Sequence, residues 1–153
     1  MNIVTDRIER RIVLKAPVAR VWRALASPEE FGRWFGVALS GSAMRAGEVL
    51  EGKITHPGYE HLTWRVVIER IDENARMSFR WHPAAIDANV DYSKEPTTLV
   101  EFLLKEVAGG TELTLIESGF DKIPAHRRDS AFRGNSSGWS QQMLNIEKHV
   151  RTP

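Results

Sequence analysis

The chain contains no cysteine, and this absence excludes several kinds of chemistry. With none among 153 residues, there is no disulfide framework, no thiol nucleophile and no zinc or iron–sulfur centre held by cysteine. Residues 1–15 carry a charge every few positions and have no apolar run long enough for a signal peptide or a membrane span. We therefore expect a cytoplasmic protein.

A strong excess of charge of either sign is also missing. The chain has 21 Lys and Arg against 20 Asp and Glu, for a formal net charge of +1. Such a chain has no broad field to attract phosphate backbones or anionic lipids, so we expect no nucleic-acid or membrane partner. Its 42% hydrophobic and 27% charged residues are ordinary for a globular protein, and the length suits one domain over residues 1–153.

The motifs of common catalytic sites are absent as well. The sequence has no Gly-rich phosphate loop, dinucleotide fingerprint or Ser/His/Asp order, and a turn explains Gly109-Gly110. His56 and His61 lie close together, but Glu60 is the one carboxylate between them, which leaves too few ligands for a metal. We expect no metal, no cofactor and no identifiable catalytic residue.

The first third of the chain predicts one strand followed by two short helices. Residues 7–15 place apolar side chains at strand spacing before Pro17. Steps of three and four then draw one helical stripe through Val18, Val21, Trp22 and Leu25. A second helix begins where Ser27 can cap, Pro28 takes the first helical position and Glu30 completes a capping box.

The rest of the chain predicts antiparallel strands and then one long helix. Alternating apolar residues indicate strands at about 48–55, 62–71, 77–81, 98–107 and 111–118. Residues 83–97 lack this periodicity and predict a long loop. Residues 125–150 predict an amphipathic helix with its stripe at Phe132, Ser136, Trp139, Met143, Ile146 and Val150. The fold class is therefore α+β, with a curved antiparallel sheet of about six or seven strands packed around the C-terminal helix.

Four stretches carry a resemblance to a known family: APVARVWRALASPEEFGRWFG (16–36), RIDENARMSFRWH (70–82), TLVEFLLKEVAGGTELTLIESGF (98–120) and NSSGWSQQMLNIEKHV (135–150). The chain resembles bacterial homologues of the C-terminal domain of the heat-shock-protein-ninety ATPase activator, in the START-like superfamily. The resemblance implies a helix-grip fold with an apolar cavity between sheet and helix. Members of this superfamily serve as lipid and hormone carriers or polyketide cyclases, so the fold does not settle the function.

Tryptophans suggest where a ligand would bind. The chain has five, and an aromatic-lined pocket for a flat or apolar ligand is one explanation, while ordinary core packing is the other. The residues that we expect to line such a pocket are Trp34, Trp64, Phe79, Trp81, Phe102, Leu115, Glu117, Trp139 and Met143.

Glu117 is the polar residue of greatest interest in this set. Alternation along its strand places it on the apolar face of Leu113 and Leu115. One possibility is a desolvated carboxyl group that acts as a proton donor, unless a nearby arginine such as Arg133 offsets the effect of burial. The other is a structural acid that is hydrogen-bonded to a backbone or tryptophan N–H.

Three functions follow from these observations. The first is a module, monomeric or homodimeric, that binds a small apolar or aromatic molecule. The second is a polyketide cyclase- or hydrolase-like enzyme that uses Glu117, and the third is a chaperone-partner domain.

Overall fold

One antiparallel sheet of seven strands organises the fold. The computed structural model describes residues 6–39, 44–87 and 89–152, and the strands lie in the order β1-β7-β6-β5-β4-β3-β2 with every neighbouring pair antiparallel. In chain order the elements are β1 (Arg7–Leu14), α1 (Val18–Ala26), α2 (Pro28–Phe35), β2 (Val37–Leu39), β3 (Val49–Ile54), β4 (Thr63–Asp72), β5 (Arg76–Trp81), β6 (Thr98–Val107), β7 (Gly110–Ser118), the 3-10 helix η1 (Phe120–Lys122) and α3 (Ala125–Val150).

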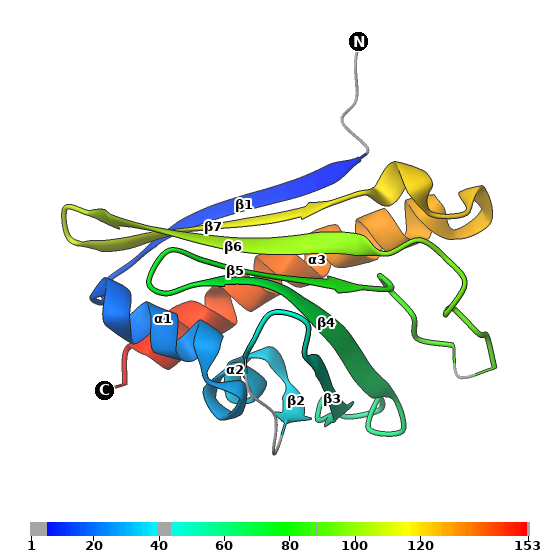
Figure 1. Cartoon of the computed structure of the whole chain (residues 1–153), viewed down its shortest axis with the longest axis horizontal. Helices are drawn as coiled ribbons and strands as arrows, with labels where there is room; N and C mark the ends of the chain where they lie inside the picture. The colour runs from blue at the N-terminus through cyan, green and yellow to red at the C-terminus, as the bar shows by residue number, and fades with distance from the viewer. Residues whose placement is uncertain (1–5, 40–43, 88, 153) are drawn as a thin grey trace, which may run out of the picture.

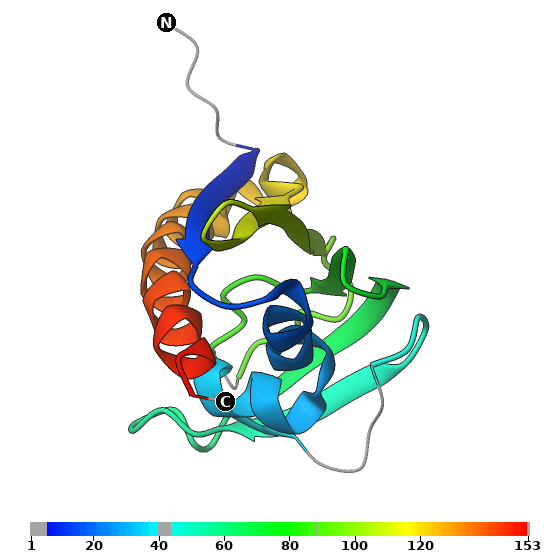
Figure 2. The same ribbon diagram turned by 90° about the vertical axis from the view of Figure 1, so that its left-hand side faces the viewer.

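The long helix α3 lies inside the curve of the sheet. Figure 1 shows it running along the sheet, and Figure 2 shows the sheet curving around it, with α1 and α2 beside its C-terminal half. Its buried residues are Ala131, Trp139, Met143, Ile146 and Val150. They face the inward residues of the central strands, which include Phe79, Phe102 and Leu115. The expected α+β helix-grip architecture is confirmed.

Local sequence signals explain the two short helices. The Ser27 side chain accepts a hydrogen bond from the backbone N–H of Glu30, as a capping residue does, and Pro28 opens α2. Gly36 ends α2 in the left-handed conformation, with φ at 97°. At Gly32 a β-carbon would lie 2.2 Å from the Val37 carbonyl oxygen, so only glycine lets β2 approach α2 this closely.

An acidic side chain joins the short helices to the end of α3. Glu30 accepts hydrogen bonds from Arg20 at 2.9 Å and Arg23 at 2.6 Å, and its Oε1 lies 2.9 Å from His149 Nε2. Burial raises the pKa of Glu30, but the bond to His149 and the charge of Arg20 outweigh it and hold that pKa below its usual value of 4.5. The cluster therefore stabilises the contact between α2 and α3 while Glu30 is ionised.

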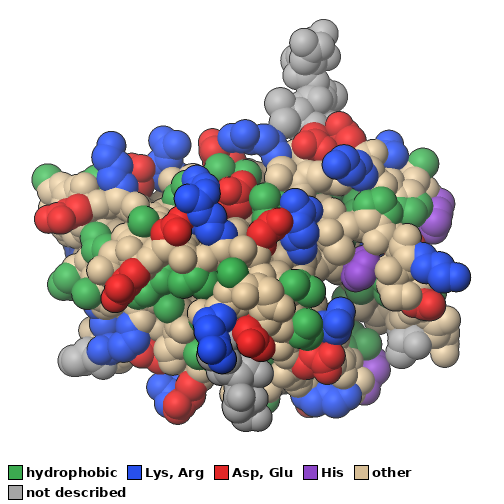
Figure 3. Space-filling model, in the orientation of Figure 1, with side chains coloured by type: hydrophobic (Ala, Val, Ile, Leu, Met, Phe, Trp, Pro, Cys, Tyr) green, Lys and Arg blue, Asp and Glu red, His purple; other side chains and the backbone are tan. Residues whose placement is uncertain are grey.

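Charges of both signs alternate on the outer surface. Figure 3 shows acidic and basic side chains next to one another on the face seen there. Exposed pairs such as Arg65–Glu51 and Arg80–Glu69 account for part of this pattern. No helix in the described ranges is long and apolar enough to cross a membrane.

Candidate functional site

A cluster of aromatic rings fills the space between α3, the end of α2 and the central strands. Phe35, the last residue of α2, lies at its centre. Its ring centroid is 4.9 Å from that of Phe31, 5.4 Å from Trp64, 6.0 Å from Trp139 and 6.1 Å from Trp81. Ring pairs at these separations attract one another beyond the burial of their area. Phe35 itself is only half-buried, so the cluster reaches the surface at this point.

Three pockets adjoin the Phe35 ring. One of about 160 Å³ lies against α3 and is lined by Phe35, Trp81, Gly134, Asn135, Gly138, Trp139 and Gln142. A second, of about 530 Å³, extends past Trp34 and Trp64 toward Thr55 and His56. A third, of about 280 Å³, lies between Trp64, Trp81 and residues 82–86. Phe35 lines all three, so the pockets adjoin one another at this residue.

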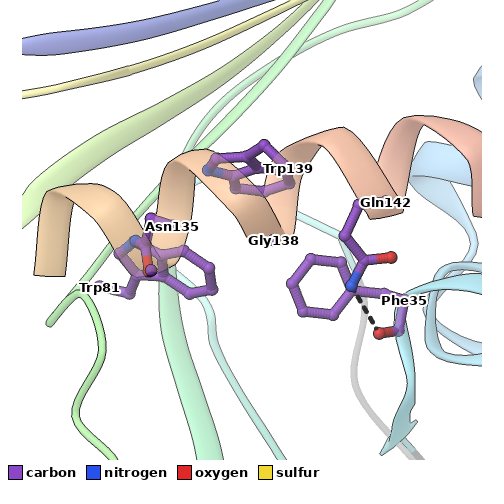
Figure 4. A pocket seen from close by; sticks show the side chains of 7 residues that line it. Phe35, Trp81, Asn135, Gly138, Trp139 and Gln142 are labelled. Carbon is purple, nitrogen blue, oxygen red and sulfur yellow. Dashed lines mark hydrogen bonds between the residues drawn. The ribbon is translucent and has the colours of Figure 1, made fainter. Parts of the chain in front are cut away.

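Helix α3 contributes an open side to the first pocket. Figure 4 shows Asn135, Gly138 and Gln142 following one another along the helix beside Trp139, with Phe35 and Trp81 below. Gln142 Nε2 donates a 2.8 Å hydrogen bond to the Phe35 carbonyl, which fixes the end of α2 against α3. A β-carbon on Gly138 would have no atom within 4 Å. The helix surface is therefore open at this glycine.

Glu117 lies behind the wall of the first pocket, fully buried. Its Oε1 accepts hydrogen bonds from Trp139 Nε1 at 2.8 Å and Asn135 Nδ2 at 2.9 Å. Its Oε2 accepts from Trp81 Nε1 at 2.7 Å and Thr98 Oγ1 at 2.6 Å. Three of these four donors line the pocket. The carboxylate thus holds both indole rings and the Asn135 amide from behind, and turns the aromatic surfaces toward the cavity.

This arrangement distinguishes the two explanations of Glu117 given by the sequence. Every contact places the carboxylate as an acceptor, which is the bonding that a buried structural acid requires. Arg133, named from the sequence as an arginine that could offset the burial of Glu117, forms an exposed ion pair with Asp129. Glu117 is bonded to tryptophan N–H groups, as the structural alternative expects.

The residues expected to line the site divide into two groups. Trp34, Trp64, Trp81 and Trp139 line the pockets around Phe35. A second group lies in the core and lines none of these three pockets, so its contact with a ligand stays a prediction: Phe79, Phe102, Leu115, Glu117 and Met143.

Sequence reasoning missed Phe35, Asn135, Gly138 and Gln142. The last three recur at steps of three and four along α3, which places them on one face of the helix, but none is apolar and the apolar periodicity did not select them. Among the described residues no three His, Asp or Glu side chains converge as metal ligands would.

Comparisons with known proteins identify the fold independently. Residues 15–151 match the model of a family described as Activator of Hsp90 ATPase homolog 1-like protein. MLL2253 from Mesorhizobium loti is similar at 21% identity over 96% of this chain and 98% of its own, with a TM-score of 0.74. The Aha1 dimer from Colwellia psychrerythraea is similar at 16% identity over 95% of this chain and 96% of its own, with a TM-score of 0.70.

A third solved structure matches this chain over part of a longer protein. DynU16, from the dynemicin biosynthetic locus, is 21% identical over 96% of this chain and 48% of its own, with a TM-score of 0.73. No curated protein matches the chain in sequence. At these identities the structural likeness establishes the fold alone.

Proposed function

Since the chain belongs to the family of Activator of Hsp90 ATPase homolog 1-like proteins, we propose that it binds a small apolar or aromatic molecule between α3 and the sheet. The observation that carries the proposal is the position of Phe35. Its half-buried ring contacts four tryptophans, Trp34, Trp64, Trp81 and Trp139, and the residue lines three pockets. Small-molecule sites are concave and mostly apolar, with a few directed polar groups, and this site has that character.

The expected affinity follows from the apolar area that a ligand can bury. An aromatic molecule of two or three rings buries about 200–300 Å², which is worth roughly 5–7 kcal/mol at about 25 cal/mol per Å². That value alone corresponds to dissociation constants of about 7–200 μM, and the costs of association weaken binding, so constants of about 0.1–1 mM are expected for unoptimised probes. A ligand that extends across two of the pockets would contact Phe35, which lines each of them.

The proposal is tested by comparing two phenylalanine truncations. Phe35→Ala removes a ring that lines all three pockets, whereas Phe132→Ala removes another half-buried ring that packs on Phe120 and lines none of them. Flavonoids, fatty acids and polyketide-like aromatics are screened by tryptophan fluorescence and by melting temperature, after native mass spectrometry of freshly purified protein. We expect at least one class to bind, and Phe35→Ala to change its affinity several-fold more than Phe132→Ala.

Two results would contradict the proposal. One is a screen in which no class changes either signal up to about 1 mM, where the mass action of even a weak ligand raises the melting temperature. The other is a ligand whose affinity responds equally to both truncations, because it would then bind elsewhere.

The family description favours a second candidate, a chaperone partner. It names an activator of a chaperone ATPase, and the Colwellia protein of this fold is a dimer. Adding the purified protein to the Hsp90-type chaperone of the same organism and measuring its ATPase rate tests this candidate directly. Light scattering decides between monomer and homodimer. The cyclase-like alternative has less support, because Glu117 lines none of the three pockets.

A further inference from the structure

One tryptophan of the site has an indole N–H with no acceptor. Trp64 is 8% exposed, and its Nε1 is a buried nitrogen for which no described residue supplies a hydrogen-bond partner. The neighbouring tryptophans differ in this respect. Trp34 donates to the Ala24 carbonyl at 2.8 Å, and Trp81 and Trp139 both donate to Glu117.

The surroundings of Trp64 explain why the protein itself does not satisfy this donor. Its ring lies among those of Phe31, Phe35, Phe79 and Trp81, at centroid separations of 5.7, 5.4, 5.8 and 6.3 Å. None of these side chains has a hydrogen-bond acceptor of ordinary strength. Buried polar groups without a partner are uncommon in folded proteins, and each needs a specific explanation.

Trp64 also lines both of the larger pockets at Phe35, but its Nε1 has no surface exposed to them, so a ligand atom reaches this nitrogen only when a neighbouring side chain moves. No Asp or Glu is among the described residues that line the three pockets, while His56, Arg65 and His82 are. The lining therefore offers hydrogen-bond donors beside aromatic surface and no acidic group to repel an electron-rich oxygen.

We propose that the ligand is a planar aromatic molecule with a carbonyl-type oxygen, and that this oxygen accepts a hydrogen bond from Trp64 Nε1. This inference rests on the proposed function and narrows it from apolar molecules in general to aromatic ketones and their relatives. After such a movement, an oxygen within hydrogen-bond distance of Nε1 would supply the acceptor that the core lacks. A pure hydrocarbon of the same shape would leave the N–H unpaired, so the site should discriminate against it.

The test uses two probes of nearly equal shape, 2-acetylnaphthalene and 2-isopropenylnaphthalene, which differ in a C=O against a C=CH₂ group. Each is titrated into ¹⁵N-labelled protein, and the five tryptophan indole signals are followed by NMR. Trp64→Phe identifies the Trp64 signal by its loss. We expect the ketone to bind roughly tenfold more tightly than the alkene, the value of one net hydrogen bond, and to move the Trp64 indole proton downfield.

Matched variants separate the hydrogen bond from the shape of the ring. In Trp64→Phe the ketone and the alkene should bind within about twofold of each other. In Trp34→Phe, which removes a pocket indole whose N–H is already bonded within the protein, both affinities should fall together and the tenfold ratio should persist.

The outcomes distinguish this inference from the proposed function. If both probes bind wild-type protein equally and the Trp64 signal does not move downfield with the ketone, the inference is wrong and the binding function stands. If neither probe, and no member of the wider screen, binds at all, the proposed function fails first. Should Trp64→Phe fail to fold, the ratio of the two wild-type affinities is still decisive, because it needs no assignment of the Trp64 signal.

Discussion

Replacing Glu117 with glutamine removes the charge behind the pocket wall and keeps the shape of the side chain. In the wild-type protein two indole N–H groups, the Asn135 amide and the Thr98 hydroxyl all donate to this carboxylate. Glutamine has one acceptor oxygen and one NH₂ group. Asn135 and Thr98 can turn to offer an acceptor to the new NH₂ group, but an indole N–H can only donate.

The expected loss of stability follows from the numbers of hydrogen-bond donors and acceptors around the side chain. Whichever way the new amide is oriented, its NH₂ faces either the Trp139 or the Trp81 N–H, and one buried donor becomes unpaired. An unpaired buried donor costs about 1–3 kcal/mol, and the remaining bonds weaken when the acceptor loses its charge. The smaller cost of burying a neutral group offsets part of this. We expect Glu117→Gln to reduce the free energy of unfolding by about 2–3 kcal/mol, or roughly 5–10 °C in melting temperature.

Urea denaturation followed by tryptophan fluorescence measures this change, with Glu112→Gln as its control. Glu112 lies on the same strand but on the opposite, partly exposed face, where its contact is a 3.9 Å pair with Arg11. That substitution should change the unfolding free energy by less than about 0.5 kcal/mol. In Glu117→Gln, one of the two indole protons should also move upfield in NMR spectra. Equal stabilities of the two variants, with unchanged indole signals, would show that Glu117 does not position the tryptophans.

Two further predictions concern the supports of the site. Because the pKa of Glu30 is lowered on folding, its contribution to stability is present above pH 4.5 and is lost as the pH falls through the lowered value. The free energy of unfolding should therefore fall less steeply below pH 4.5 in Glu30→Gln than in Glu29→Gln, a variant of its exposed neighbour. If the two variants show parallel curves of unfolding free energy against pH, this prediction is wrong. Gly32→Ala should destabilise by about 1–3 kcal/mol through its clash with the Val37 carbonyl. Gly134→Ala, with open space around the new methyl group, should stabilise α3 by about 0.5–1 kcal/mol, and calorimetry that gives both the same sign would refute the steric argument.

The parts of the fold that could be predicted from the sequence are those set by local patterns. The cap at Ser27, the strands at Thr98–Val107 and Gly110–Ser118 and the helix Ala125–Val150 all depend on residues within a few positions of one another. Alternation also placed Glu117 inward correctly, because the inward set of a strand follows from a period of two.

Features that depend on pairing between distant residues could not be predicted in the same way. The strand β2 has only three residues, too few for a periodic signal, and forms because it pairs with β3. The β4–β5 register shifts between Ile68 and Arg70. This irregularity lets Ile71 pack against the core although strict alternation from Trp64 would turn it outward.

The mouth of the pocket could not be predicted from the sequence, for a different physical reason. Its α3 residues, Asn135, Gly138 and Gln142, are polar or lack a side chain, so the periodicity of apolar residues assigns them to the solvated face of the helix. Yet glycine within a helix costs about 1 kcal/mol relative to alanine, and no neighbouring atom excludes a β-carbon at Gly138. Packing therefore does not require glycine there, and helix stability opposes it. Gly138 lines two of the three pockets, so the missing side chain at this position leaves the site open on its α3 side, one residue before the buried Trp139.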